Sequence, residues 1–200
     1  MKRRTLDVIF STGGLILAVL ALVLAIVLQA QANFADDYVR DQLSAQQIVF
    51  TPVERLNDEE RQATCLVTYA GQTLSTGPQA ECYANEYIGL HLTETNDGKT
   101  YAQTSTEARA AAAAADQAVE DGAPDPELED QAEEVNAKVQ TLFRGETLRG
   151  LLLTSYGFSI FGERAQQAAW VAFGVAFVLL LASIAGFIHA FTRSKDEVVA

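Results

Sequence analysis

The stretch that decides the fold lies near the start of the chain, where residues 8–28 read VIFSTGGLILAVLALVLAIVL without a charged side chain. At about 1.5 Å of rise per residue, a helix of this length crosses a hydrocarbon core about 30 Å thick. A second apolar block covers residues 165–191, and its only polar members are Gln166, Gln167, Ser183 and His189. The two blocks predict transmembrane helices at residues 8–29 and 165–191 rather than buried helices of a soluble protein.

The basic residues beside these blocks predict their orientation. Three precede the first block and two follow the second: Lys2, Arg3, Arg4, Arg193 and Lys195. By the positive-inside rule, residues 1–7 and 192–200 are expected in the cytoplasm, and the segment between the blocks outside the plasma membrane. Arg164 abuts the second block on the outer side and argues weakly against this orientation. The expected fold is therefore mostly α, with two transmembrane helices flanking an all-helical extracytoplasmic domain.

An alternative for the first block is a cleaved signal peptide. Residues 30–32 read AQA, which has the small-x-small form of a cleavage site behind a basic start and an apolar stretch. The apolar stretch is longer than the 7–15 residues usual in signal peptides. We therefore favour an uncleaved anchor, and cleavage would leave only the second span in the mature protein.

The segment between the spans is strongly acidic. Residues 29–164 hold 9 Lys or Arg and 23 Asp or Glu, a net charge of −14, whereas the whole chain carries −12. The segment has no basic patch that could neutralise phosphates, which argues against nucleic-acid binding. The simplest interpretation is that the acidic side chains keep the domain soluble. Binding of cations or of a basic partner is the alternative.

Cys65 and Cys82 are the two cysteines of the chain. They do not form a C-x-x-C motif, and no histidine stands at a zinc-like spacing from either. Outside the membrane the compartment is oxidising, so a single disulfide is expected, with two buried thiols as the alternative. Such a disulfide requires Cα atoms within about 7 Å of each other.

The outer segment, residues 30–141, shows helical spacing and helix-start signals but no convincing strand alternation. Helix starts are expected at Thr51-Pro52, at Asn57 or Asp58, at Thr76, at Thr104 with Glu107 in the capping-box position, and at Asp125-Pro126. Gly71 is expected to end the second of these helices, and residues 96–99 read as a turn. Gly145 is expected to kink or end the last one.

Residues 142–164, which begin LFRGETLRGLLLTSYGFSIFG, form an apolar segment directly before the second span. One hypothesis is a membrane-interface helix that buries its apolar side chains while its arginines meet lipid headgroups. The alternative is that the segment belongs to the core of the outer domain. The residues assigned to the interface are Arg144, Leu148, Arg149, Leu151, Leu152, Tyr156 and Phe158.

Small residues recur in both spans at small-x-x-x-small spacing, which permits close helix packing. The pairs are Gly14 and Ala18, Ala21 and Ala25, and Ala182 and Gly186. They weakly favour pairing of the two spans with each other or with a partner helix.

The sequence contains no catalytic, cofactor-binding or metal-binding motif that we can assign. Phosphate loops, G-x-G-x-x-G turns and G-x-S-x-G elbows are absent from it. The predicted topology separates His91 from His189, whereas a two-histidine iron site needs both on one side of the membrane. We expect His91 to be a structural helix residue, and we expect no cofactor.

The chain resembles a family of uncharacterised actinobacterial two-span membrane proteins. The resemblance rests on MKRRTLDVIFSTGG, NFADDYVRDQLSAQQIVFTP, YANEYIGLHL, GKTYA and QTLFRGETLRGLLL, and it covers most of the chain. Members often bear the label aromatic ring-opening dioxygenase, alpha subunit. The resemblance thus implies that activity, but the sequence lacks its iron ligands.

Two classes of function follow from the sequence. The first is a non-catalytic accessory or interaction protein of the cell envelope, with the lipid bilayer and a membrane-protein partner as its contacts. The alternative is an enzyme subunit, such as an aromatic ring-opening dioxygenase alpha subunit. A sensor is a weaker third class, because the predicted cytoplasmic tails are short. We favour the first class, and the sequence leaves the oligomeric state open.

Overall fold

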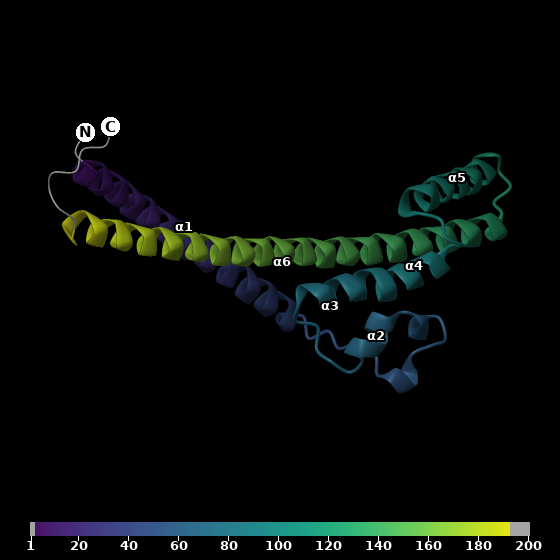
Figure 1. Ribbon diagram of the computed structural model, residues 1–200. Helices are drawn as coiled ribbons and strands as arrows, with labels where there is room; N and C mark the ends of the chain where they lie inside the picture. The colour runs from purple at the N-terminus through teal and green to yellow at the C-terminus, as the bar shows by residue number, and fades with distance from the viewer. Residues whose placement is uncertain (1–2, 193–200) are drawn as a thin grey trace. The chain divides into compact units, whose positions relative to one another are not determined.

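The computed structural model describes residues 3–192, and within them it contains helices and no named strand (Figure 1). Two helices are much longer than the rest, α1 (Arg3–Ala45) and α6 (Pro126–Thr192). Shorter helices lie between them in the chain: α2 (Thr64–Tyr69), α3 (Gly77–Cys82), η3 (Tyr83–Ile88), α4 (Gly89–Thr95) and α5 (Tyr101–Glu120). Two 3₁₀ turns, η1 (Val53–Arg55) and η2 (Glu60–Gln62), precede α2. The mostly α class expected from the sequence is confirmed.

The chain divides into two compact units, which we describe separately. Unit 1 combines residues 1–38 with residues 159–200, and unit 2 covers residues 39–158. The predicted tails, residues 1–7 and 192–200, fall only partly within the described chain. Of the basic residues used for orientation, Lys2, Arg193 and Lys195 lie outside the described residues.

Unit 1 is an antiparallel helix pair formed by the first part of α1 and the last part of α6. Asp7 lies beside His189 at one end, with Oδ2 3.4 Å from Nδ1. Gln29 bonds to Gln166 farther along the pair. Both helices are long and apolar enough to cross a membrane.

Unit 2 has a hydrophobic core to which short and long helices both contribute. Its most deeply buried large side chains include Phe50, Leu66, Leu74 and Leu142. A single antiparallel bridge between Val49 and Thr73 closes the segment that holds η1, η2 and α2. The amide of Leu74 donates to the carbonyl of Ile48 at 2.8 Å beside this bridge.

Two of the expected helix starts, Thr76 and Asp125-Pro126, are confirmed, whereas Thr51-Pro52 is followed only by the three-residue η1 without a side-chain cap. The Thr76 side chain caps α3 in a complete capping box with Gln79, and Asp125 Oδ1 accepts from the amide of Glu127 at the start of α6. Gly71 has a φ of +73° just after α2, a conformation that glycine adopts without steric cost. Asn96 and the two residues after it form the expected turn.

Three local predictions were wrong. The cap of α5 is Thr100 with Gln103, and Thr104 is fully buried, where Asn96 Nδ2 donates to its hydroxyl at 2.9 Å. The single helix expected from Asn57 or Asp58 is divided into η2 and α2, because Ala63 is extended with ψ 100°. Gly145 does not end α6, which continues without a break to Thr192. Its missing side chain instead makes room for Leu92.

Candidate functional site

The contact between the two helices of unit 1 is made by small side chains that recur every seventh residue. In α1, Ser11, Ala18, Ala25 and Ala32 are buried at this spacing. In α6, Gly162, Ala169, Ala176, Ser183 and Ala190 are buried in the same way. A seven-residue repeat keeps one face of each helix against its partner over many turns, as in coiled coils. We call these nine residues the small-residue seam.

Close contacts along the seam leave little room for additional atoms. A Cβ atom added to Gly14 would lie 2.6 Å from Ser183 Oγ, and one added to Gly162 would lie 2.8 Å from Ala35 Cβ. A Cβ on Gly186 would overlap Ser11. Small residues therefore let the two backbones approach closely, which is how helices pack when no hydrophobic force drives them together.

The large apolar side chains of unit 1 face the opposite way. Leu20 is 59% exposed, Phe177 62% and Trp170 67%. Only 17% of the most apolar window of each helix is buried. The core helix of a soluble protein would bury most of this surface, since exposed apolar area costs roughly 25 cal/mol per Å². Unit 1 thus has small and hydroxyl side chains inside and large apolar ones outside.

Two glutamines join the helices of unit 1 by a reciprocal pair of hydrogen bonds. Gln29 Nε2 donates to Gln166 Oε1 at 2.7 Å, and Gln166 Nε2 donates to Gln29 Oε1 at 2.6 Å. Gln29 Nε2 also donates to Asn33 Oδ1 at 2.9 Å. Amide pairs of this kind satisfy both side chains and fix the register of two helices in an apolar environment.

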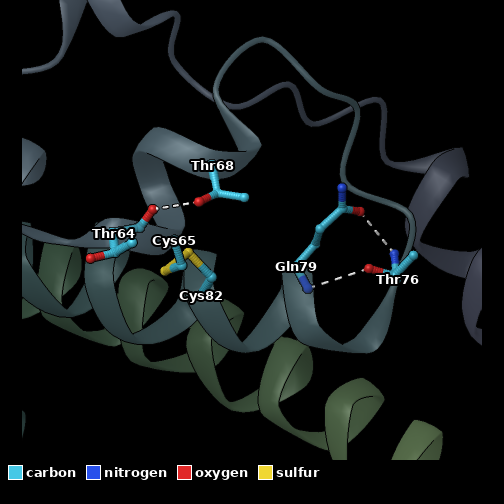
Figure 2. Close-up of a disulfide and its surroundings, with 6 residues drawn as sticks. All are labelled: Thr64, Cys65, Thr68, Thr76, Gln79 and Cys82. Atoms are coloured by element: carbon cyan, nitrogen blue, oxygen red, sulfur yellow. Dashed lines mark hydrogen bonds between the residues drawn. A yellow bond between two sulfur atoms is a disulfide. The ribbon is translucent and has the colours of Figure 1, made fainter.

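Cys65 and Cys82 form a disulfide that joins α2 to the end of α3 (Figure 2). Their Cα atoms are 6.1 Å apart, within the limit that a disulfide requires. The Thr68 hydroxyl donates to the Thr64 carbonyl in α2, and Gln79 completes the cap of α3. The bond therefore links two short helices of six residues each, which local hydrogen bonds alone hold weakly.

The residues assigned to the membrane interface all lie on α6, but they do not share one face. Leu152 is buried in the core of unit 2, and Arg149 donates to Asn85 Oδ1 at 3.2 Å. Tyr156 is half-buried. The others are exposed: Arg144, Leu148, Leu151 and Phe158. The segment is continuous helix and contributes Leu142 and Leu152 to the core of unit 2, whereas the membrane-interface assignment stays a prediction.

Unit 2 contains an open cavity of about 650 Å³. Asn85, Glu86 and Gly89 line one side of it, and Glu146 and Arg149 of α6 line another. Part of this lining belongs to η3, a π-helix, which is a rare form frequent at functional sites. Arg149 Nη1 also lies 3.4 Å from Glu146 Oε2, so its charge is balanced within the lining. Glu59, Gln62 and Ala63 line it beside η2.

A row of aromatic rings runs along η3 and α4. The ring centroids of Tyr83 and Tyr87 are 4.8 Å apart, and those of Tyr87 and His91 are 4.6 Å apart. Phe50 meets Tyr83 edge to face at 5.3 Å. Burial raises the pKa of the Tyr83 hydroxyl, and the neighbouring Tyr87 raises this pKa further.

Ion pairs on the surface of unit 2 join the start of α5 to the segment before it. Lys99 Nζ lies 2.7 Å from Glu107 Oε1, and its hydrogen bond lowers the pKa of that carboxyl. Asn96 Nδ2 also donates to Glu107 at 3.3 Å. Glu134 and Lys138 form a second pair at 2.8 Å on α6. These ion pairs are exposed to solvent, so each contributes little to stability, and they do not form a reactive centre.

Within residues 3–192, no group of three or more His, Cys, Asp or Glu side chains could hold a metal ion. No protein-family model, curated protein or solved structure matches the chain.

Two features of these units are absent from the sequence predictions. Of the small pairs noted in the spans, Ala18 and Ala25 lie in the seam, whereas Ala21 is half-buried and Ala182 is exposed. Glu60 Oε1 of η2 lies 3.4 Å from His91 Nε2 of α4. This contact had no sequence signal, because the two residues lie in different local structures.

Proposed function

We propose that the protein is a two-span integral membrane protein of the plasma membrane that presents a disulfide-bonded helical domain outside the cytoplasm. The observation that carries this proposal is the arrangement of unit 1, with large apolar side chains outward and small ones in the seam. Lipid tails solvate the outer side chains, and close backbone packing holds the pair. A soluble helix pair would have the opposite arrangement.

The orientation follows from two independent features. A disulfide persists in an oxidising compartment, and Cys65 and Cys82 lie in unit 2. The basic residues near the two termini favour a cytoplasmic location for both ends. We therefore propose that both termini are cytoplasmic and that the central domain is outside.

Within this topology we propose a non-catalytic role, as an accessory protein that contacts a membrane-protein partner in the envelope. The acidic charge of the domain, the exposed side chains on α6 and the open cavity support contact with other molecules. The resemblance to uncharacterised actinobacterial two-span membrane proteins is part of the same proposal. Among the described residues, no group of three or more His, Cys, Asp or Glu side chains could hold the iron of a ring-opening dioxygenase.

Topology is tested by labelling single introduced cysteines in cells with a membrane-impermeant maleimide. The native cysteines are bonded to each other and do not react without reductant. Ala113→Cys, at an exposed position of α5, is expected to react in intact cells. Thr5→Cys, exposed near the start of α1, is expected to react only after permeabilisation. The reverse pattern would refute the proposed orientation.

The accessory role is tested by purification from native membranes in a mild detergent, followed by identification and quantification of co-purifying proteins. A partner recovered at constant stoichiometry through size-exclusion chromatography is expected. Recovery of the protein alone, with bound iron and ring-cleaving activity, would contradict the role and favour the enzyme alternative.

A further inference from the structure

The cavity of unit 2 is lined by two carboxylates that have no partner within the described chain. Glu59 directly precedes η2 and Glu86 belongs to η3, and both residues are exposed and line the cavity of about 650 Å³. Within residues 3–192, neither carboxylate takes part in an ion pair or a side-chain hydrogen bond. Two unpaired acidic groups in one concave site favour a positively charged occupant.

The other charged groups of the lining are already paired. Lys99 is bonded to Glu107, which lies outside the lining, and Arg149 contacts Glu146, which lies within it. Three carboxylates against two bases leave the lining with a net charge of −1. A metal ion is a poor occupant, because no group of three or more His, Cys, Asp or Glu side chains in the described chain could hold one. The unpaired charge therefore favours an organic cation.

Apolar side chains form the rest of the wall beside these charges. Ala63, Leu90, Leu92 and Leu142 belong to the same lining, and Leu92 and Leu142 are part of the core of unit 2. Cavities of about 300–1,000 Å³ that combine apolar side chains with a few polar groups are typical of binding sites. A lysine or arginine side chain has the same division, because its methylene stem packs on apolar surface while its charged head meets polar groups.

Arg149 supplies the lining with a hydrogen-bond donor that the chain itself does not satisfy. Its Nη2 donates to Asn85 Oδ1 at 3.2 Å, and its Nη1 donates to Glu146 Oε2 at 3.4 Å. Its Nε is buried beside Gly89 and has no hydrogen-bond partner among the described residues. Buried donors are nearly always bonded, so this guanidinium favours a further acceptor, such as a peptide carbonyl that accompanies the cation.

We propose that this cavity binds a basic side chain of the partner protein, lysine or arginine, together with the peptide group beside it. The inference rests on the proposed accessory function and names the chemistry by which the partner is recognised. The cationic head pairs with Glu59 and Glu86, and the methylene stem packs on the leucines of the lining. A peptide carbonyl of the partner accepts from Arg149.

The ligand chemistry is tested by saturation-transfer NMR titration of the full chain in lipid nanodiscs, with empty nanodiscs as the blank. The probe is N-acetyl-lysine methylamide, whose dissociation constant is expected on the order of 1 mM for a ligand of this size. N-acetyl-norleucine methylamide lacks the charge, and pentylamine lacks the peptide groups, so each is expected to bind roughly three- to tenfold more weakly. Equal binding of the norleucine probe would overturn the proposal. Equal or tighter binding of pentylamine would assign the cavity to a free amine instead.

A pair of double variants locates the binding site. Glu59→Gln/Glu86→Gln removes both unpaired charges of the lining and is expected to weaken binding of the lysine probe roughly three- to tenfold. Asp58→Asn/Glu94→Gln removes two exposed charges of the same unit that lie outside the lining, so it is expected to leave binding unchanged. An equal loss in both double variants would overturn the proposal, as would no binding of the lysine probe to the wild type.

The partner itself gives the second measurement, in the mild-detergent purification from native membranes. Glu59→Gln/Glu86→Gln is expected to lower the amount of partner recovered roughly three- to tenfold relative to the wild type and to the control double variant. Unchanged recovery would contradict this inference and leave the accessory function standing. Recovery of the wild type without any partner would contradict the accessory function, and with it the assignment of the cavity to a partner's side chain.

Discussion

At the scale of single residues, glycines in α6 show how one missing side chain can decide a contact. A Cβ atom on Gly145 would lie 3.1 Å from Leu92 Cγ and 3.2 Å from Leu92 Cδ1, and it would overlap the other methyl group. Gly150, which lies farther along the same helix, has nothing within 4 Å of the corresponding position. Both glycines are therefore interior residues of α6, but only Gly145 lies against another side chain at the position where a Cβ atom would be.

Gly145→Ala is expected to destabilise unit 2 by about 1–2 kcal/mol, because overpacking against Leu92 outweighs the gain in helix propensity. Gly150→Ala is expected to stabilise it by about 0.5–1 kcal/mol. Urea denaturation of both variants in the same detergent, followed by circular dichroism, measures the difference. Equal stabilisation by the two alanines would show that Leu92 adapts at no cost.

At the scale of elements, the helices of unit 1 are held by the small-residue seam and by the Gln29–Gln166 pair. Ala25 is fully buried in the seam, whereas Ala182 lies on the outer face of α6. Both are alanines in an apolar helix. The same substitution at each therefore compares the effect of a larger side chain between the two helices with its effect on the outer surface of the pair.

Ala25→Leu is expected to lower the melting temperature of the detergent-solubilised protein by several degrees, because the extra methyl groups force the backbones apart. Ala182→Leu should leave it within about one degree, because its new side chain enters detergent or lipid. Size-exclusion chromatography after a temperature series gives both values. The seam would be refuted as the packing surface if Ala182→Leu were the more damaging change.

The disulfide links α2 and α3, two helices that are too short to be stable in isolation. Reduction is expected to cost about 3 kcal/mol of unfolding free energy for a closed loop of this size, as its 17-residue separation indicates. Denaturation with and without reductant measures this loss, and Cys65→Ser/Cys82→Ser should show no response to reductant. An equal response in the double variant would assign the effect to something other than the disulfide.

At the scale of the whole molecule, the exposed apolar surface of unit 1 determines where the chain can be stable. Transfer of side chains such as Leu20, Phe177 and Trp170 from water to hydrocarbon is favourable by about 1.5–3 kcal/mol each. The protein is expected to remain in the membrane pellet during extraction with alkaline carbonate. A peripheral protein in the same sample, released under these conditions, is the control. Release of this chain to the supernatant would contradict the two-span proposal.

The helical class, the two long apolar helices and two of the helix starts could be predicted from the sequence. These features depend on local chemistry: an uncharged run, a Thr or Asp cap, a proline in the first turn. Thr76 and Asp125 were identified correctly for this reason. Thr104 was misassigned because Thr100 has the same local chemistry with Gln103, and only packing shows that Thr104 is buried beside Asn96.

The candidate sites depended much more on tertiary structure. Alanines are common on every face of an apolar helix, so the sequence could not show which of them faced the partner. Likewise Arg144 and Arg149 look equivalent in sequence, but only Arg149 turns toward Asn85. The sequence by itself thus determined the helices and their apolar character, because these are sums of local preferences. Only the tertiary structure decided the seam, the cavity wall and the Glu60–His91 contact, because each joins residues whose proximity no local preference encodes.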